Sequence, residues 1–245
     1  MSGALLLQSL ILGILLGGLY ALLAAGLTLY FGIMRVVMIA HSAFLILAAY
    51  LAWWFNRETG IDPLVSLVVT VQRRIPLPYA SASLDFFGAQ VPVVKLIAFG
   101  LAAVALALLF VLLKYTKFGQ ALRATIQHPE AARLVGINTD RVAGYGFGLG
   151  LATAAIGGTA LSLDATIYPS LHWHWIGPLM AIIVVGGLGS IPGAAIAALV
   201  LGIAQSLLQL PLGPTWAQTV FYVALFATLM FRPQGFFGGR LAQRF

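Results

Sequence analysis

Residues 165–231 contain no aspartate, glutamate, lysine or arginine, and no other feature of the sequence limits the possible folds so strongly. A surface that faces water needs charged side chains, and soluble domains carry about 25% of them. Here 8% of the residues are charged and 61% are hydrophobic. Residues 1–34 also lack all four charged types. The sequence therefore predicts an integral membrane protein whose first apolar stretch is a retained span rather than a cleaved signal peptide.

Apolar stretches recur along the whole chain, and about 20 apolar residues suffice to cross the hydrocarbon layer. Breaks rich in glycine and proline at 186–193 and 211–214 divide the long uncharged stretch. We expect an all-α fold, a polytopic transmembrane helix bundle that forms a single domain over residues 1–245. Residues 56–90 are predicted to be irregular and to lie outside the membrane or at its interface, with an apolar piece at 64–71 too short to span it. The predicted spans are 4–31, 36–55, 91–113, 142–163, 177–190 (a short one), 192–210 and 216–231.

The basic residues predict the orientation of these spans. Eight of the thirteen lysines and arginines lie in residues 114–141 or after residue 231. Loops rich in lysine and arginine remain in the cytosol, so both regions are expected there, joined by an even number of crossings, with the N-terminus outside. A net charge of +7 would suggest nucleic acid as a partner of a soluble protein. Here the basic residues flank apolar spans, so we expect membrane lipid and no nucleic acid.

The loop at 114–141 is predicted to contain one short helix, residues 128–136. Proline is favoured at the first helical position, which Pro129 would occupy. Glu130 would lie in the first turn, where the helix dipole favours an acid. Gly136 is a typical helix stop, and Asn138 to Asp140 offer a cap for the next span. A short helix held between two spans can transmit a movement to both of them.

Several kinds of chemistry find no support in the sequence. There is no cysteine, and His172 with His174 has no third metal ligand at useful spacing. The glycine-rich break at 186–193 lacks the Lys-Ser/Thr pair of a phosphate-binding loop. No motif pairs a nucleophile with a base, so an intramembrane enzyme is the weaker hypothesis. We expect no cofactor and no enzymatic activity.

Some residues allow both a functional and a structural interpretation. His41 and Ser42 lie in a predicted span, where a polar residue either lines a path or bonds to another helix. The break at Gly186, Gly187 and Gly189 is interpreted as pore-lining or as a site of tight packing. Other interpretations concern helix contact and the membrane interfaces: Gly13 with Gly17 as a close helix contact, Arg35 as a cytosolic anchor, and Asp164, His172 and His174 with Trp173 and Trp175 as part of an outer aromatic belt.

Five ordered blocks of sequence resemble one family. Glu130-Ala131-Ala132 followed by Gly136 matches the EAA loop of bacterial ABC importer permeases. Residues 18–22, 118–124, 134–138, 185–193 and 232–235 are similar to the permeases of branched-chain amino acid ABC transporters. The likeness covers nearly the whole chain except residues 56–90. In that family a loop helix sits in a groove of the ATP-hydrolysing subunit.

The resemblance implies a passive permease subunit of the bacterial inner membrane, which forms half of a pore. Leucine, isoleucine, valine or a similar small amino acid would be carried, with urea or short amides as the alternative cargo. An ATP-independent channel or carrier is a further alternative. The implied partners are a second homologous permease, two cytosolic ATPase subunits and a periplasmic binding protein. The residues implied in ATPase coupling are Pro129, Glu130, Ala131, Ala132, Arg133 and Gly136, and those of a translocation path are His41, Ser42, Gly186, Gly187 and Gly189.

Two departures from the family pattern affect these expectations. Members usually read Asn-x-Ala-His-Gly in the second span, where this chain reads Met38-Ile39-Ala40-His41-Ser42. The region 56–90 looks shortened, as though one inward and one outward crossing were missing. A loss of two crossings would leave the predicted orientation of the remaining spans unchanged.

Overall fold

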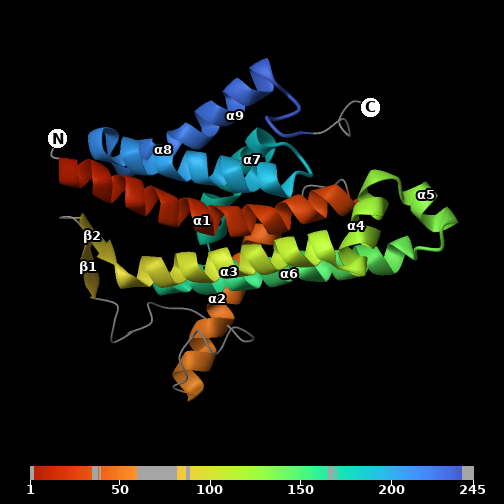
Figure 1. Ribbon diagram of the computed structural model, residues 1–245. Coiled ribbons are helices and arrows are strands. Elements are labelled where there is room, and N and C mark those ends of the chain that lie inside the picture. The colour runs from red at the N-terminus through yellow and green to blue at the C-terminus, as the bar shows by residue number, and fades with distance from the viewer. Residues whose placement is uncertain are drawn as a thin grey trace.

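A computed structural model describes residues 3–34, 38, 40–59, 82–86, 89–164, 168 and 170–238. Over these residues the chain is almost entirely helical, with one short antiparallel hairpin (Figure 1). The expected all-α bundle is thus confirmed. The elements are α1 (Gly3–Met34), α2 (Ala40–Thr59), β1 (Ser83–Phe86), β2 (Ala89–Pro92), α3 (Val93–Tyr115), α4 (Lys117–Gln127), α5 (Pro129–Leu134), α6 (Thr139–Asp164), α7 (Leu171–Gly186), α8 (Ile191–Ala217) and α9 (Thr219–Phe231).

Four of the described helices, α1, α3, α6 and α8, are long and apolar enough to cross a membrane. Three shorter apolar helices accompany them: residues Ala40–Leu51 of α2, then α7 and α9. Each of the seven predicted spans therefore corresponds to a helix. The chain is a multi-pass membrane protein, in which α7, of 16 residues, and α9, of 13 residues, are shorter than a full crossing.

α1 lies at the centre of the bundle and runs antiparallel to α8 (Figure 1). A Cβ added at Gly13 would lie 2.7 Å from Ile203 Cα, and one at Gly17 would lie 2.8 Å from Leu199 Cα. The two backbones therefore touch, which only small residues permit. The Tyr20 hydroxyl donates a hydrogen bond of 3.1 Å to Gln205 Oε1 across the same contact. The predicted helix contact of Gly13 and Gly17 is confirmed.

An aromatic cluster joins three helices in the core. The ring of Tyr20 in α1 lies 5.3 Å, centroid to centroid, from both Trp175 in α7 and Phe221 in α9. Trp175 is buried, so its assignment to an outer aromatic belt is wrong, whereas Trp173 is 69% exposed. Trp175 is buried because neighbouring helices cover one face of α7. A local sequence pattern does not reveal such a contact.

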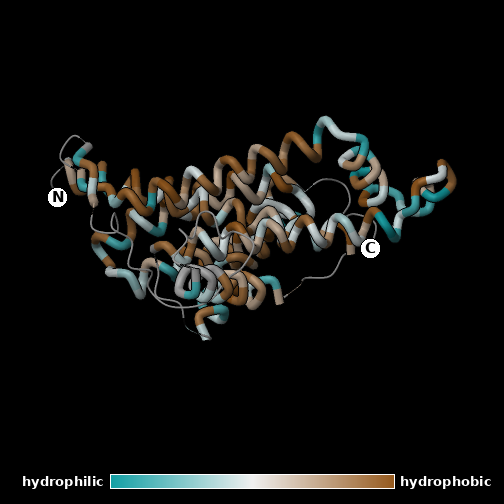
Figure 2. Tube along the Cα trace, turned by 90° about the horizontal axis from the view of Figure 1, so that it is seen from below, coloured by the Kyte–Doolittle hydropathy of each residue, from teal (hydrophilic) through white to brown (hydrophobic). Residues whose placement is uncertain are grey.

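The two ends of the bundle differ in character. α4 and α5 project from one end, where polar residues gather in Figure 2. The β1–β2 hairpin lies at the other end, where Gln8 Nε2 donates a hydrogen bond of 3.1 Å to Gln90 O. The prediction that residues 56–90 are irregular is wrong for residues 83–86, which pair with 89–92. The apolar piece at 64–71 lies outside the described residues, as do Arg35, Arg240 and Arg244.

The second predicted break, at 211–214, is confirmed as a kink that separates two helical pieces within α8. α8 continues to Ala217, and Gly213 alone has a non-helical conformation (φ 79°, ψ 168°). Pro211 and Pro214 flank it and remove two backbone donors from the helix. The first predicted break separates two helices, since α7 ends at Gly186 and α8 begins at Ile191.

Candidate functional site

The loop between α3 and α6 holds two helices, α4 and α5, of which the sequence predicted only the second. Thr116 separates α3 from α4 and caps α4, because its hydroxyl accepts a hydrogen bond of 3.0 Å from Gly119 N. The same hydroxyl donates to Leu112 O at 2.6 Å. A Cβ at Gly119 would lie 2.2 Å from Leu113 O, so α4 turns tightly against the end of α3.

α4 anchors the loop in the end of the bundle. Leu122 is completely buried in a cluster with Leu29 of α1 and Leu113 of α3. Ile126 and Ile191, at the start of α8, pack against the same cluster. A force applied to α4 would therefore reach three membrane helices through buried side chains. The sequence did contain a signal for this helix, since Phe118, Leu122 and Ile126 recur at every fourth position and share one face, but the charged residues between them favoured a loop.

α5 has the ends that the sequence predicts. Pro129 occupies its first turn, and Ile137 N donates to Ala132 O at 3.0 Å while Gly136 N donates to Arg133 O at 3.0 Å. This pair of bonds is the Schellman arrangement, which requires the left-handed conformation found at Gly136 (φ 84°). Asn138 then caps α6, since its Oδ1 accepts a bond of 3.0 Å from Arg141 N.

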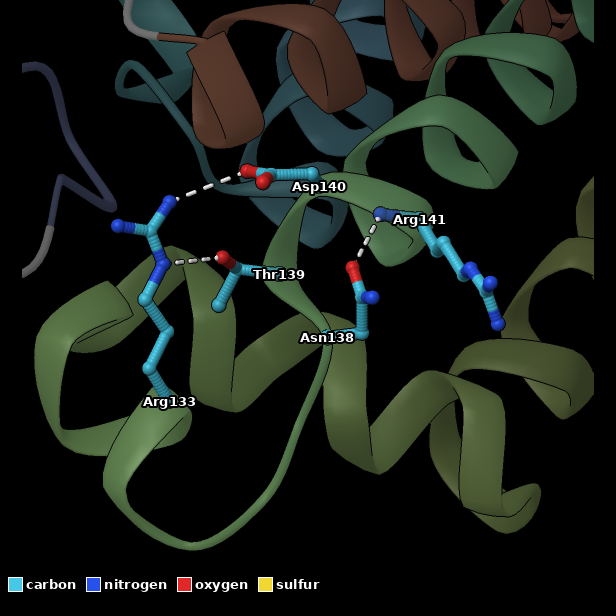
Figure 3. Close-up of polar contacts among 5 residues, drawn as sticks. All are labelled: Arg133, Asn138, Thr139, Asp140 and Arg141. Carbon is cyan, nitrogen blue, oxygen red and sulfur yellow. Dashed lines mark hydrogen bonds and ion pairs between the residues drawn. The ribbon is translucent and has the colours of Figure 1, made fainter.

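Arg133 ties α5 to the first turn of α6 (Figure 3). Its Nε donates to Thr139 Oγ1 at 2.7 Å, and one of its terminal nitrogens lies 3.1 Å from Asp140 Oδ1. The planar guanidinium can make both bonds at once, which a lysine ammonium cannot reproduce. α5 is thus joined to α4 at its start through His128, which donates from its N to Ala124 O of α4 and accepts at its O from Ala132 N of α5, and it is held by α6 at its end.

The outer side of α5 is apolar and unusually exposed. Leu134 is 89% exposed and Val135 is 75% exposed, while Ala132 on the inner side is buried. Pro129, Glu130 and Ala131 are also exposed. Two large apolar side chains at the tip of a water-exposed helix typically mark a protein-binding surface. Leu134 and Val135 were not predicted as coupling residues, although two adjacent apolar residues in a charged loop were the available signal.

The structure places the candidate path residues in two separate regions. His41 and Ser42 begin α2 and are buried; His41 Nε2 lies 3.0 Å from Leu23 O of α1. Both residues line a small recess between α1, α2 and α7. A hydrogen bond from His41 to another helix agrees with its structural interpretation, and its place at the recess keeps the functional one open. The remaining lining residues are all apolar: Leu27, Met38, Ile176, Leu179 and Met180.

The glycines of the first break pack against residues 235–238, in the segment that follows α9. Phe236 N donates to Val185 O at 2.9 Å, and Phe237 N donates to Gly186 O at 3.3 Å. A Cβ at Gly187 would lie 2.2 Å from Gly238 N, whereas one at Gly189 would have Gly32 Cα, at 3.9 Å, as its neighbour. Gly186 and Gly187 therefore serve tight packing here. Their part in a translocation path stays a prediction, as does that of Gly189.

No cluster of three or more possible metal ligands occurs among the described residues. His174 makes a side-chain hydrogen bond with Gln218, near the junction of α8 and α9. His172 packs against the ring of Trp173 at 4.9 Å between centroids. The two histidines thus interact with different neighbours instead of facing a common point.

Comparisons with known proteins agree with this arrangement. A family profile described as "Branched-chain amino acid transport system / permease component" matches residues 9–72 and 71–230. The chain is 26% identical to the high-affinity branched-chain amino acid transport system permease protein LivH of Salmonella typhimurium, over 95% of each chain. LivH of Escherichia coli (strain K12) gives the same identity and coverage. BraD of Pseudomonas aeruginosa, which carries the same description, is 24% identical over 95% of each chain. No solved structure matches the chain.

The lengths of these alignments bear on the shortened region. Each of the three spans 293 aligned positions, more than the 245 residues of the chain, so these relatives contain residues that this chain lacks. The two parts of the profile match meet at residues 71 and 72. That junction lies inside residues 56–90, where the sequence predicts a shortening.

Proposed function

The chain belongs to the family of permease components of branched-chain amino acid transport systems, and on that premise we propose that it forms half of an ATP-driven import pathway. Its cargo is leucine, isoleucine, valine or a similar small amino acid. A second, homologous permease completes the pathway, and two cytosolic ATPase subunits supply the energy. A periplasmic binding protein delivers the solute. The complex lies in the bacterial inner membrane, with α4, α5 and the segment after α9 in the cytosol.

One observation carries this proposal: α5 presents an exposed apolar tip and is fixed at both ends to membrane helices. Leu134 and Val135 supply the tip, and Arg133 connects it to α6. α4 connects it to α1, α3 and α8 through the cluster around Leu122. When the ATPase subunits close on ATP, a helix held in this way moves as a rigid body and reorients the helices to which it is attached.

The test uses charged substitutions at the tip in the assembled transporter. Val135→Asp places a charge in an interface that the proposal requires to be dry, so we expect leucine-stimulated ATP hydrolysis to fall roughly tenfold, as a loss of about 1.4 kcal/mol in binding would produce. Val135 is preferable to Ala132, because Ala132 is buried and its replacement would also disturb α5 itself.

Leu84→Asp provides the matched control. Leu84 is a similarly exposed apolar residue, but it lies in β1 at the opposite end of the molecule. This variant should retain the stimulated rate and should co-purify with the ATPase subunits. A normal stimulated rate in Val135→Asp would contradict the coupling role of α5.

The same reconstituted complex distinguishes the alternative functions. A stand-alone channel or carrier would give leucine flux in liposomes without ATP, whereas an importer gives none. A permease for urea or short amides would carry these solutes, and not leucine, on ATP hydrolysis. The curated relatives named above are described as branched-chain amino acid permeases, which favours leucine as the first solute to assay.

A further inference from the structure

α3 and α4 carry several basic residues and no acidic one. Between Asp85 and Glu130 the sequence contains no aspartate or glutamate, and its bases there are Lys95, Lys114, Lys117 and Arg123. The last three lie close together around Thr116, where α3 ends and α4 begins, and all three are exposed. Residues 114–117 together with Arg123 are called the elbow below. The elbow thus carries three positive charges and no negative one of its own.

The side chain of Arg123 reaches back from α4 to the end of α3. One of its terminal nitrogens donates a hydrogen bond of 3.4 Å to the backbone oxygen of Lys114. A guanidinium has five N–H donors, so this bond leaves others available for an anion. Neither Arg123 nor Lys114 forms an ion pair with a carboxylate that the structure describes, whereas Arg133 in the same loop has Asp140 as its partner. Two cationic side chains therefore meet at one end of α3 without being neutralised.

The side chain of Lys114 lies back along α3, toward the membrane-spanning part of the helix. Its Nζ lies 5.2 Å from the ring centroids of both Phe110 and Tyr115. Both rings are exposed, that of Phe110 to 49% and that of Tyr115 to 68%. Aromatic rings and long basic side chains at the end of an apolar span typically lie at the level of the lipid headgroups. Lys114 therefore points toward lipid.

The lengths of α3 and α4 agree with this position. At about 1.5 Å per residue, Lys114 lies roughly 32 Å along α3 from Val93, and the hydrocarbon layer is about 30 Å thick. A crossing that begins near Val93 therefore ends near Lys114, beside the phosphate groups of the lipids. α4 then adds about 16 Å between the elbow and α5. The elbow thus faces the membrane surface rather than the surface proposed for the ATPase.

An exposed apolar ridge on α3 leads to the elbow. Val104, Leu108 and Val111 follow one another at helical spacing and so lie on one face. They are 61%, 65% and 50% exposed, respectively. Lys114 continues this face, three residues after Val111. A molecule that has both an acyl chain and an anionic headgroup would cover the ridge and the charges together, which a free phosphate ion cannot do.

We propose that the elbow binds the headgroup of an anionic phospholipid, whose phosphate is held by Lys114 and Arg123 and whose acyl chain lies along the ridge. The guanidinium offers paired donors to the phosphate oxygens, and the ammonium adds a compact charge. Lys117 supplies a third positive charge at the start of α4. A lipid bound in this way fixes α4 at the membrane surface. The site requires only that α3 crosses a membrane, so it goes beyond the proposed function.

Native mass spectrometry of the full-length wild-type chain tests the site. The purified protein in detergent is titrated with phosphatidylglycerol and, separately, with phosphatidylcholine that has the same acyl chains. We expect phosphatidylglycerol to bind at least about tenfold more tightly, because it carries a net negative charge. An excess of inorganic phosphate should leave it bound, since the ridge also holds the acyl chain. Equal affinities for the two lipids, or displacement by inorganic phosphate, would overturn the lipid site.

Lys114→Gln and Arg123→Gln locate the site within the chain. Each variant removes one charge of the elbow, so we expect the apparent Kd for phosphatidylglycerol to rise about fivefold in either one. Arg133→Gln is the matched control, because it removes a charge of the same loop that is already paired with Asp140. The control should bind the lipid as tightly as the wild type. Unchanged affinity in both elbow variants, or the same loss in all three, would reject the elbow as the binding site.

The assembled transporter separates the lipid site from a protein contact and from the proposed function. Elbow variants that bind phosphatidylglycerol normally but lose the ATPase subunits on purification would make the elbow a protein-binding surface and reject the lipid site. Selective lipid binding at the elbow without ATP-driven leucine uptake would support the site while rejecting the importer. Unselective binding in a complex that imports leucine would do the reverse. The comparison of the two lipids uses the wild-type chain, so it remains decisive if a variant fails to fold.

Discussion

Arg133 links the surface that the proposal assigns to the ATPase with the first turn of a membrane helix. Its contacts to Thr139 and Asp140 are largely exposed to water, with the two charged side chains 61% and 88% accessible. Exposed ion pairs contribute about 1 kcal/mol or less to the free energy of folding. This contact therefore matters more for the orientation of α5 relative to α6 than for stability.

Replacing Arg133 should therefore affect coupling more than folding. We expect Arg133→Gln to lower leucine-stimulated ATP hydrolysis about threefold and to change the free energy of unfolding by less than about 1 kcal/mol. Arg133→Lys keeps the charge but loses the two-pronged geometry, so it should restore only part of the rate. Rates equal to the wild type in both variants would show that α5 does not need this connection.

Glycines in α6 offer a second residue-scale prediction. A Cβ at Gly150 would lie 2.6 Å from Tyr30 Cε1, whereas one at Gly148 would have nothing within 4 Å in the described part of the chain apart from its neighbours and the backbone of α6 itself. Gly148→Ala should raise the thermal stability of the purified protein, since alanine favours the helix by about 1 kcal/mol. Gly150→Ala should lower it through the clash with Tyr30. Equal shifts in a thermal unfolding assay would contradict the close packing of α1 on α6.

The roles of some residues could be predicted from the sequence and those of others could not, for a physical reason. The ends of α5 depend on backbone geometry within a few residues, so Pro129, Gly136 and Asn138 could be assigned in advance. The partner of His41 is a carbonyl eighteen positions earlier, on another helix, and the burial of Trp175 depends on α1 and α9. Contacts of this kind arise from packing, which a local pattern does not encode.

At the scale of elements, the segment after α9 completes the turn between α7 and α8. Gly187 and Gly189 both have positive φ angles, of 97° and 84°, in that turn. Only Gly187 also touches the segment, since its Cβ would collide with Gly238. The two glycines therefore form a natural pair for separating backbone strain from packing.

We expect alanine at either position to cost about 1 kcal/mol for the strained backbone. Gly187→Ala should cost more, because it also displaces the segment and its bonds to Val185 and Gly186. Limited proteolysis of the purified protein should then cut the segment several times faster in Gly187→Ala than in Gly189→Ala. Similar cleavage rates would indicate that the segment is held by contacts other than these.

α4 was not predicted, although Phe118, Leu122 and Ile126 have the spacing of an amphipathic helix. Its basic and polar residues agreed with a solvated loop, yet Leu122 and Ile126 face the bundle. The long apolar spans were predictable because lipid demands continuous hydrophobic helices. The order of the helices in space, with α1 between α8 and α6, was not predictable from their hydrophobicity.

For the whole molecule, the proposed function requires the two ends of the bundle to face different compartments. α5 lies at one end and the β1–β2 hairpin at the other (Figure 1). The chain contains no cysteine, so single-cysteine variants give an unambiguous readout. Val135 and Leu84 are exposed residues at the two ends.

In intact spheroplasts, a membrane-impermeant maleimide should label Leu84→Cys and leave Val135→Cys unlabelled. After the membrane is opened, both should react. The parent chain, which lacks a thiol, is the negative control. Labelling of Val135→Cys in sealed spheroplasts would place α5 outside the cell and would remove the basis of ATP-driven import by this protein.

The pairing of Phe236 and Phe237 with Val185 and Gly186 has a consequence for biosynthesis. The ribosome makes the α7–α8 turn well before it makes the residues that cover it. The carbonyl groups of Val185 and Gly186 and the glycines of the turn therefore stay uncovered until α9 has entered the bilayer. The turn between α7 and α8 is thus covered only when α9 inserts. A nascent chain arrested before that step would expose the uncovered turn to membrane proteases.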